Sequence, residues 1–135
     1  MKPMIALAIC SLAVASGCAE LGTRAVHCDV GPVSVDDRAH AKSDEINVYG
    51  ENKWICWTLT KSTYRFQPDS IQIDDPKADA FANCKKGDKN GELDGPDLIR
   101  CKDKNPYPAR YKYEIRLYDQ NGNPGPRYDP WVVNN

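Results

Sequence analysis

Apolar and charged residues alternate along residues 111–118, and this is the strongest periodic signal in the chain. Successive side chains of a strand point to opposite faces of a sheet, so the pattern predicts a strand with one buried face. Residues 54–60 form a second run that is largely apolar on both faces, which predicts a central strand. The residues expected to face the core are Ile55, Trp57, Leu59, Tyr111, Tyr113, Ile115 and Leu117.

Shorter runs of the same kind predict further strands. Residues 36–45 predict a polar loop with at most one helical turn, and residues 85–97 predict a second loop. The secondary structure of residues 78–84 is ambiguous from the sequence. The shorter runs lie at 25–35 (one strand or two, broken at Gly31-Pro32), 46–49, 64–66, 71–73, 98–101 and 131–133.

Ten prolines and nine glycines, with many asparagines and aspartates, separate these runs at short intervals. Such spacing is typical of turns in all-β domains, and helix-forming runs are sparse. About seven or eight short antiparallel strands in one domain indicate a sandwich of two sheets.

The first residues have the three parts of a secretory signal. Lys2 supplies the positive charge, residues 5–15 are apolar, and small residues follow at 15–17. The apolar run suits a signal peptide and is shorter than the roughly 20 residues that span a bilayer. We therefore expect residues 1–17 to be a signal peptide, residues 18–24 a tether and residues 25–135 the β-sandwich domain.

Two cleavage sites compete at the end of the signal. The sequence Ala13-Val14-Ala15 fits general signal peptidase, which would cut after Ala15. The sequence Ala15-Ser16-Gly17-Cys18 resembles a bacterial lipobox, in which Cys18 carries the lipid and becomes the first residue. Ala19 follows Cys18, and the absence of Asp at this position favours sorting to the outer membrane in a Gram-negative host.

The number of cysteines favours lipidation of Cys18. Cys10 leaves with the signal, so a cut after Ala15 would leave an odd number of thiols in an oxidising compartment. If Cys18 carries a lipid, four cysteines remain, and they allow three connectivities. We favour Cys84–Cys101, which closes a polar loop, together with Cys28–Cys56.

The charge and the size of the mature chain exclude some classes of function. Removing residues 1–17 leaves 118 residues, enough for one domain, with 17 basic against 19 acidic side chains. The basic residues form no stripe along the sequence, so we expect no binding of nucleic acid. The sequence also lacks the G-x-S-x-G pattern of serine hydrolases, and pairing the four cysteines leaves no nucleophilic thiol, so we expect no catalysis.

Residues 46–134 resemble a group of small exported bacterial proteins of unknown function. The resemblance lies in Trp57-x-Leu59, Tyr64-x-Phe66, Ile71, Phe81-x-x-Cys84, Cys101-x-Asp103-x-Asn105, Tyr111-x-Tyr113-x-Ile115 and Asp129-Pro130-Trp131-Val132-Val133-Asn134. It implies a cupredoxin-like fold, which is a Greek-key β-sandwich, and no particular activity. We therefore expect a Greek-key antiparallel β-sandwich, cupredoxin-like or Ig-like.

Metal ions fit the sequence poorly, although such a fold suggests copper. A type 1 copper site needs two histidines, a free cysteine and usually a methionine, whereas the mature chain has His27, His40 and no methionine. Residues 88–94 space oxygen ligands as calcium loops do, but Leu93 and Ile99 replace the required Gly and Glu. We expect no metal and no cofactor.

The expected partner surface is the polar loop with a nearby tyrosine, because exposed tyrosines are favoured at recognition surfaces. We expect an outer-membrane lipoprotein that faces the periplasm and has a binding or structural role. A secreted or periplasmic inhibitor or immunity-type protein that binds a protein target, and a metal or small-ligand carrier, are the alternatives. The candidate surface residues are Lys85, Asp88, Asn90, Glu92, Asp94 and Tyr107.

Overall fold

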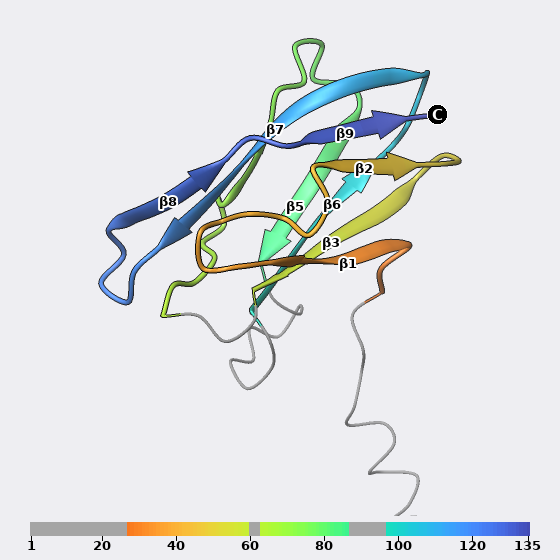
Figure 1. Ribbon diagram of the computed structural model, residues 1–135. Helices are drawn as coiled ribbons and strands as arrows, with labels where there is room; N and C mark the ends of the chain where they lie inside the picture. Colours follow the sequence, from red (N-terminus) through yellow and green to blue (C-terminus); the bar gives the residue numbers. More distant parts are fainter. Residues whose placement is uncertain (1–26, 60–62, 87–96) are drawn as a thin grey trace, which may run out of the picture.

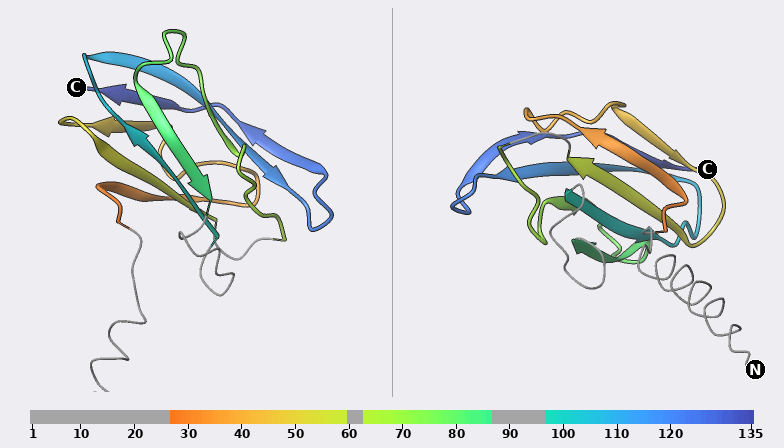
Figure 2. Two further views of the ribbon diagram at one scale, coloured as in Figure 1. Left: turned by 180° about the vertical axis from the view of Figure 1, so that it is seen from behind. Right: turned by 90° about the horizontal axis from the view of Figure 1, so that it is seen from below.

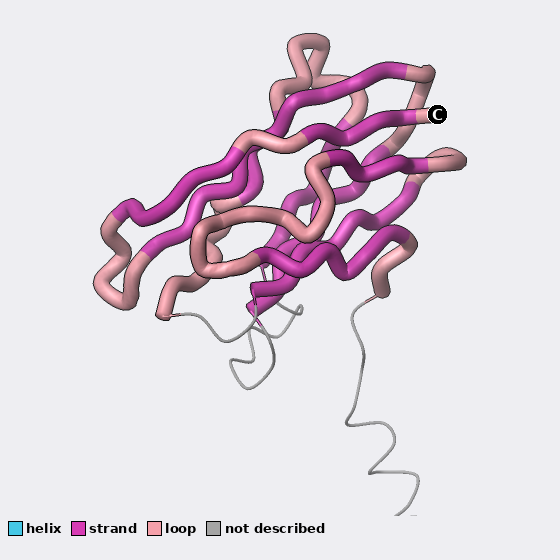
Figure 3. Tube along the Cα trace, viewed as in Figure 1, coloured by secondary structure: helices cyan, strands magenta, loops and turns pink. Residues whose placement is uncertain are grey.

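The computed structural model describes residues 27–59, 63–86 and 97–135, and the regular elements in this part of the chain are all strands (Figures 1 and 3). The all-β class predicted from the sequence is confirmed. The strands are β1 (Val30–Val35), β2 (Glu45–Val48), β3 (Lys53–Leu59), β4 (Ile71–Ile73), β5 (Phe81–Lys86), β6 (Asp97–Asp103), β7 (Ala109–Tyr118), β8 (Pro124–Tyr128) and β9 (Trp131–Asn134).

The strands form two sheets that pack against each other as a sandwich (Figure 2). The first sheet has the order β1-β3-β6-β5. The second sheet has the order β2-β9-β7-β4, and β8 pairs with β7. The strands β1 to β5 therefore alternate between the two sheets, whereas β6 follows β5 within the first sheet and β7, β8 and β9 all belong to the second.

The core lies between the two inner faces. Ile55 and Trp57 on β3 and Ile115 on β7 are fully buried, as the alternating pattern predicts. Every other core-facing residue expected on these two strands is also buried. The indole N–H of Trp57 donates a hydrogen bond to the Tyr113 hydroxyl at 3.1 Å, which joins the first sheet to the second inside the core.

Two strand pairs are parallel, whereas we expected antiparallel pairing throughout. β1 runs parallel to β3, and β2 runs parallel to β9. A tight turn cannot join parallel neighbours. The turn residues in the sequence therefore carry no information about these two pairings, which bring distant segments together.

β1 is a single strand with an irregularity at the Gly31-Pro32 break that the sequence suggested. Its register against β3 shifts between Val30 and Val33. Gly31 has a φ of +97°, and its backbone lies against the carbonyl of Cys56 on β3. The break therefore bends one strand and does not divide it into two.

Other boundaries differ from expectation at polar or proline-rich positions. Residues 64–66 contribute an isolated bridge between Arg65 and Tyr118 instead of a strand. β5 extends to Lys86, into the segment expected to be a loop, and β8 occupies a proline- and glycine-rich segment for which we expected no strand. Residues 36–45 contain no helical turn, and the Asp36 carboxylate accepts the backbone N–H groups of Arg38 and His40 there.

Both predicted disulfides are present. Cys28–Cys56 ties the segment before β1 to the central strand β3, and Cys84–Cys101 ties β5 to β6. Disulfides of this kind typically stabilise a small domain by about 2–4 kcal/mol each. All four thiols of the described domain are therefore oxidised, which is consistent with a non-cytoplasmic environment.

Candidate binding surface

Trp54 lies half-buried on the outer face of the first sheet, the face that points away from the core. Lys102 is directly opposite on β6 in the register, so the two side chains share this face. The guanidinium carbon of Arg100 is 4.2 Å from the centre of the Trp54 ring, and the Lys102 Nζ is 5.9 Å from it. Both distances suit cation–π contacts. We call Trp54, Arg100 and Lys102 the Trp54 group.

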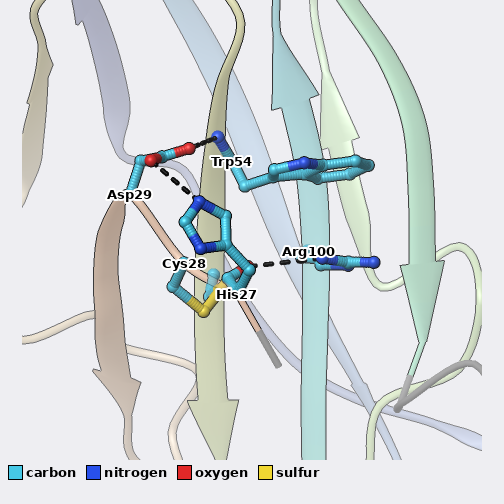
Figure 4. The surroundings of a disulfide bond; sticks show 6 residues. His27, Cys28, Asp29, Trp54 and Arg100 are labelled. Atoms are coloured by element: carbon cyan, nitrogen blue, oxygen red, sulfur yellow. Dashed lines mark hydrogen bonds and ion pairs between the residues drawn. A yellow bond between two sulfur atoms is a disulfide. The ribbon is translucent and has the colours of Figure 1, made fainter. Parts of the chain in front are cut away.

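The segment that leads into β1 crosses the same face (Figure 4). Arg100 donates a hydrogen bond to the carbonyl of His27 at 3.3 Å, and Cys28 is bonded to β3 through the disulfide. Asp29 accepts the backbone N–H of Trp54 at 2.8 Å and lies 2.9 Å from His27 Nε2. The N–H of Trp54, more than His27, lowers the pKa of Asp29. These contacts hold the segment against the first sheet.

The second sheet carries a closely similar arrangement on its own outer face. The guanidinium carbon of Arg110 lies 4.2 Å from the centre of the Trp131 ring, and the Lys112 Nζ lies 5.7 Å from it. Arg110 also pairs with Glu45 at 3.1 Å, on an exposed surface. We call Trp131, Arg110 and Lys112 the Trp131 group. It differs from the Trp54 group in having a carboxylate partner.

The residues of the expected partner surface are distributed along β5 and beyond it. Lys85 is exposed and directly opposite Arg100 in the register, so it shares the face of the Trp54 group. Tyr107 is half-buried, and its hydroxyl donates a hydrogen bond to Asp79 at 3.1 Å. Asp79 lies just before the first residue of β5, whereas Lys85 lies near its last residue. The remaining candidates, Asp88, Asn90, Glu92, Asp94 and the lipidation candidate Cys18, lie outside the described residues.

Sequence reasoning did not identify the Trp54 group. Arg100 and Lys102 are two residues apart, and this spacing places them on one face of a strand. The predicted strand, however, ended at Cys101, so Lys102 fell outside it. The position of Trp54 between them depends on the register of β3 against β6, which no local pattern contains.

A hollow of about 300 Å³ lies beside the end of β1 and the loop that follows it. The Asp36 carboxylate in its lining accepts two backbone N–H groups of the same loop at 2.9 Å each. This carboxylate therefore holds the loop together, and we assign no ligand to the hollow. Its lining residues are Ser34, Val35, Asp36, His40, Ala41 and Lys42.

Asp103 is fully buried at the end of β6. Its Oδ1 accepts the backbone N–H of Asn105 at 2.9 Å and the Asn134 side-chain amide at 3.0 Å. Asn105 in turn donates to the Gly50 carbonyl at 3.0 Å. Burial, more than the nearby charge of Asp75, raises the pKa of Asp103. The carboxyl thus connects β6 with β9 and, through Asn105, with the turn before β3. We therefore assign Asp103 a structural role.

Within residues 27–59, 63–86 and 97–135, no three His, Cys, Asp or Glu side chains come together in a way that could hold a metal ion. The same ranges contain no helix capable of crossing a membrane. Neither a protein-family model nor a curated protein matches this chain. The surfaces described above are therefore interpreted on their own chemistry.

Proposed function

We propose that this chain is an exported lipoprotein of the bacterial envelope, with Cys18 as its lipid-carrying first residue and outer membrane sorting on the periplasmic side. Its β-sandwich domain acts through binding or as a structural component and not through catalysis. The lipid would hold the domain at the membrane, because a diacylglycerol with an additional acyl chain binds a bilayer durably.

The observation that carries this proposal is the pairing of four cysteines. Cys28–Cys56 and Cys84–Cys101 use every thiol of the described domain. After removal of residues 1–17, Cys18 is then the one cysteine of the sequence without a partner in the same chain. A lipid on its sulfur removes a free thiol that would mispair in an oxidising compartment.

The same pairing supports a non-catalytic role. A disulfide sulfur is neither a nucleophile nor a metal ligand of the thiolate kind. Asp103, the buried carboxyl with a raised pKa, is held by Asn105 and Asn134 inside the fold. The four cysteines and the Asp103 carboxyl therefore have structural roles.

Replacing Cys18 tests the anchor. We expect the full chain, expressed in a Gram-negative host, to fractionate with membranes and to incorporate labelled palmitate. Cys18→Ser should lose both properties, because the lipid has no other attachment point. Cys10→Ala is the matched control: it removes the cysteine inside the signal, so its mature product should still be lipidated and membrane-bound.

The mass of the mature N-terminus distinguishes the two cleavage sites. A diacylated or triacylated Cys18 supports the proposal. A product that begins at Ser16, or a Cys18→Ser chain that still fractionates with membranes, contradicts it.

A further inference from the structure

The outer face of the first sheet carries a local excess of positive charge. Arg100 and Lys102 on β6 and Lys85 on β5 share this face according to the register. Among the described residues none of the three forms an ion pair with a carboxylate. The nearby acid, Asp29, is occupied by the backbone N–H of Trp54 and by His27.

Trp54 and Arg100 are arranged before any partner binds. The guanidinium is held over the indole ring at 4.2 Å and is also hydrogen-bonded to the His27 carbonyl. A side chain that is already ordered loses less conformational entropy on binding. Indole rings with one apolar and one polar side favour the boundary between lipid and water, and guanidinium groups bind phosphate well.

The chain enters the domain on this same face. His27 and Cys28 lie over β3, held by the disulfide and by the hydrogen bond from Arg100 on the neighbouring strand β6 (Figure 4). Residues 19–26 separate Cys18 from His27. Even fully extended, such a segment spans about 30 Å. A lipid on Cys18 would therefore keep this face within a short distance of the bilayer.

From the charge, the ordered Trp54 group and the point of entry, we propose that the outer face of the first sheet docks on an anionic phospholipid surface. The proposal rests on the lipid anchor proposed above for its position in the cell. Trp54 lies at the level of the headgroups, and Arg100, Lys102 and Lys85 contact lipid phosphates. The anchor and the face then act together, and the domain is oriented on the membrane.

The outer face of the second sheet differs in its charge pairing, and this difference supports the first sheet as the docking surface. Arg110 of the Trp131 group is paired with Glu45, and Glu114 neutralises Arg116 and lies 4.0 Å from Arg127. Arg110, Arg116 and Arg127 on that face therefore have carboxylate partners, and anionic lipid would have to displace these carboxylates.

Vesicle binding by the Cys18→Ser chain, which carries no lipid, tests the face independently of the anchor. We expect binding to vesicles of phosphatidylcholine with phosphatidylglycerol, weakening as salt is raised, and little binding to pure phosphatidylcholine. R100Q/K102Q in this chain should lower the partition coefficient about 25-fold, since each basic side chain near such a surface contributes about fivefold.

The matched control is R110Q/K112Q, which makes the same charge change beside Trp131 and should leave binding nearly unchanged. Quenching of tryptophan fluorescence by brominated phosphatidylglycerol gives a second readout. We expect Trp54→Phe to abolish most of the quenching and Trp131→Phe to preserve it. Unchanged thermal melts would show that the variants are folded.

Equal losses in the two double variants, or equal binding to neutral and anionic vesicles, would overturn the proposal. So would a concentration-dependent dimer that protects Trp54 without vesicles, because a second copy would then occupy the face. If Cys18 carries no lipid but the face binds vesicles as expected, the anchor is wrong and the docking surface stands.

Discussion

Asp103 has a buried carboxyl whose second oxygen, Oδ2, makes no hydrogen bond within the described structure. Burial in a low-dielectric interior disfavours the charged form, and the neighbouring Asp75 adds repulsion. The two hydrogen bonds to Oδ1 from Asn105 and Asn134 offset part of this cost. The result is a pKa above the ordinary value of 3.8 in the folded protein.

The raised pKa predicts how stability depends on pH. The folded state holds the Asp103 proton more tightly than the unfolded chain, so this contribution is fully present below about pH 3.8 and is lost as pH rises through the folded pKa. Asp103→Asn keeps the acceptor for both donors and removes the titration.

Urea unfolding across this pH range should therefore show that the free-energy difference between Asp103→Asn and the native chain grows in favour of the variant as pH rises. Measuring this difference cancels the other carboxylates, including Asp29, whose lowered pKa acts in the opposite sense. A constant difference at every pH would contradict the prediction.

At the residue scale, strand periodicity predicted which side chains face the core. The cysteine pairs were also predicted, because Cys84 and Cys101 flank a polar loop and their pairing leaves Cys28 with Cys56. The burial of Asp103 was not predicted, although this residue continues the inward positions of Ile99 and Cys101. An acid at the end of an apolar face was a usable signal. The contacts of Trp54 with Arg100 were not predictable, because they require the register between two strands.

β1 is an edge strand whose position depends on the close approach of Gly31 to β3. A Cβ at this residue would lie 2.6 Å from the Cys56 carbonyl oxygen and 2.7 Å from the Val33 nitrogen. These neighbours are backbone atoms, which cannot rotate away as the end of a side chain can. The positive φ of +97° is a second obstacle to any other residue.

Gly31→Ala should therefore destabilise the domain by more than about 1 kcal/mol, as expected when both conformation and space are incompatible. Gly122→Ala is the matched control, because Gly122 also has a positive φ, of +84°, but its Cβ would meet a side-chain nitrogen at 3.4 Å. Thermal or urea unfolding of both variants should show the larger loss for Gly31→Ala. An equal loss would mean that φ alone matters there.

Elements were predictable where periodicity is strong and were missed where proline interrupts it. β8 contains Pro124, Gly125 and Pro126, which are typical of turns. β8 forms nonetheless because it pairs with β7. It lies at an edge of the second sheet, and proline is tolerated in edge strands. The partner strand, and not the local sequence, determines this element.

The two layers of the molecule are joined through Trp57 on β3 and Tyr113 on β7. Their rings lie 5.5 Å apart, and the buried hydrogen bond between them is 3.1 Å long. Removing one partner of a buried hydrogen bond leaves the other unsatisfied. The packing of one sheet on the other therefore includes a buried polar contact.

Tyr113→Phe should lower the free energy of unfolding by about 1–3 kcal/mol, because the Trp57 N–H would lose its acceptor. Tyr118→Phe provides the comparison, since the Tyr118 hydroxyl bonds to Asp69 at 2.7 Å on the exposed surface and water can replace it. Chemical denaturation should give a small change for this control. A similar loss in both variants would refute the importance of the internal bond.

The sandwich as a class could be predicted because many short alternating runs, separated by turns, leave few other solutions. The order of strands could not, because β1 and β2 pair in parallel with strands that come later in the chain. The candidate surface depends on this order. Lys85 was identified as a surface residue, but its neighbours on the face became visible only with the sheet assembled.

The parallel pairing of β2 with β9 has a consequence for when the domain can fold. Residues 45–48 find their partners at 131–134, so synthesis or translocation must reach the last strand before the second sheet is complete. Contacts between such distant segments form late and slowly, because a long loop must close first. The second sheet can therefore close only when residues 131–134 are available, so the β2–β9 pairing is expected to be a late step in the folding of this domain.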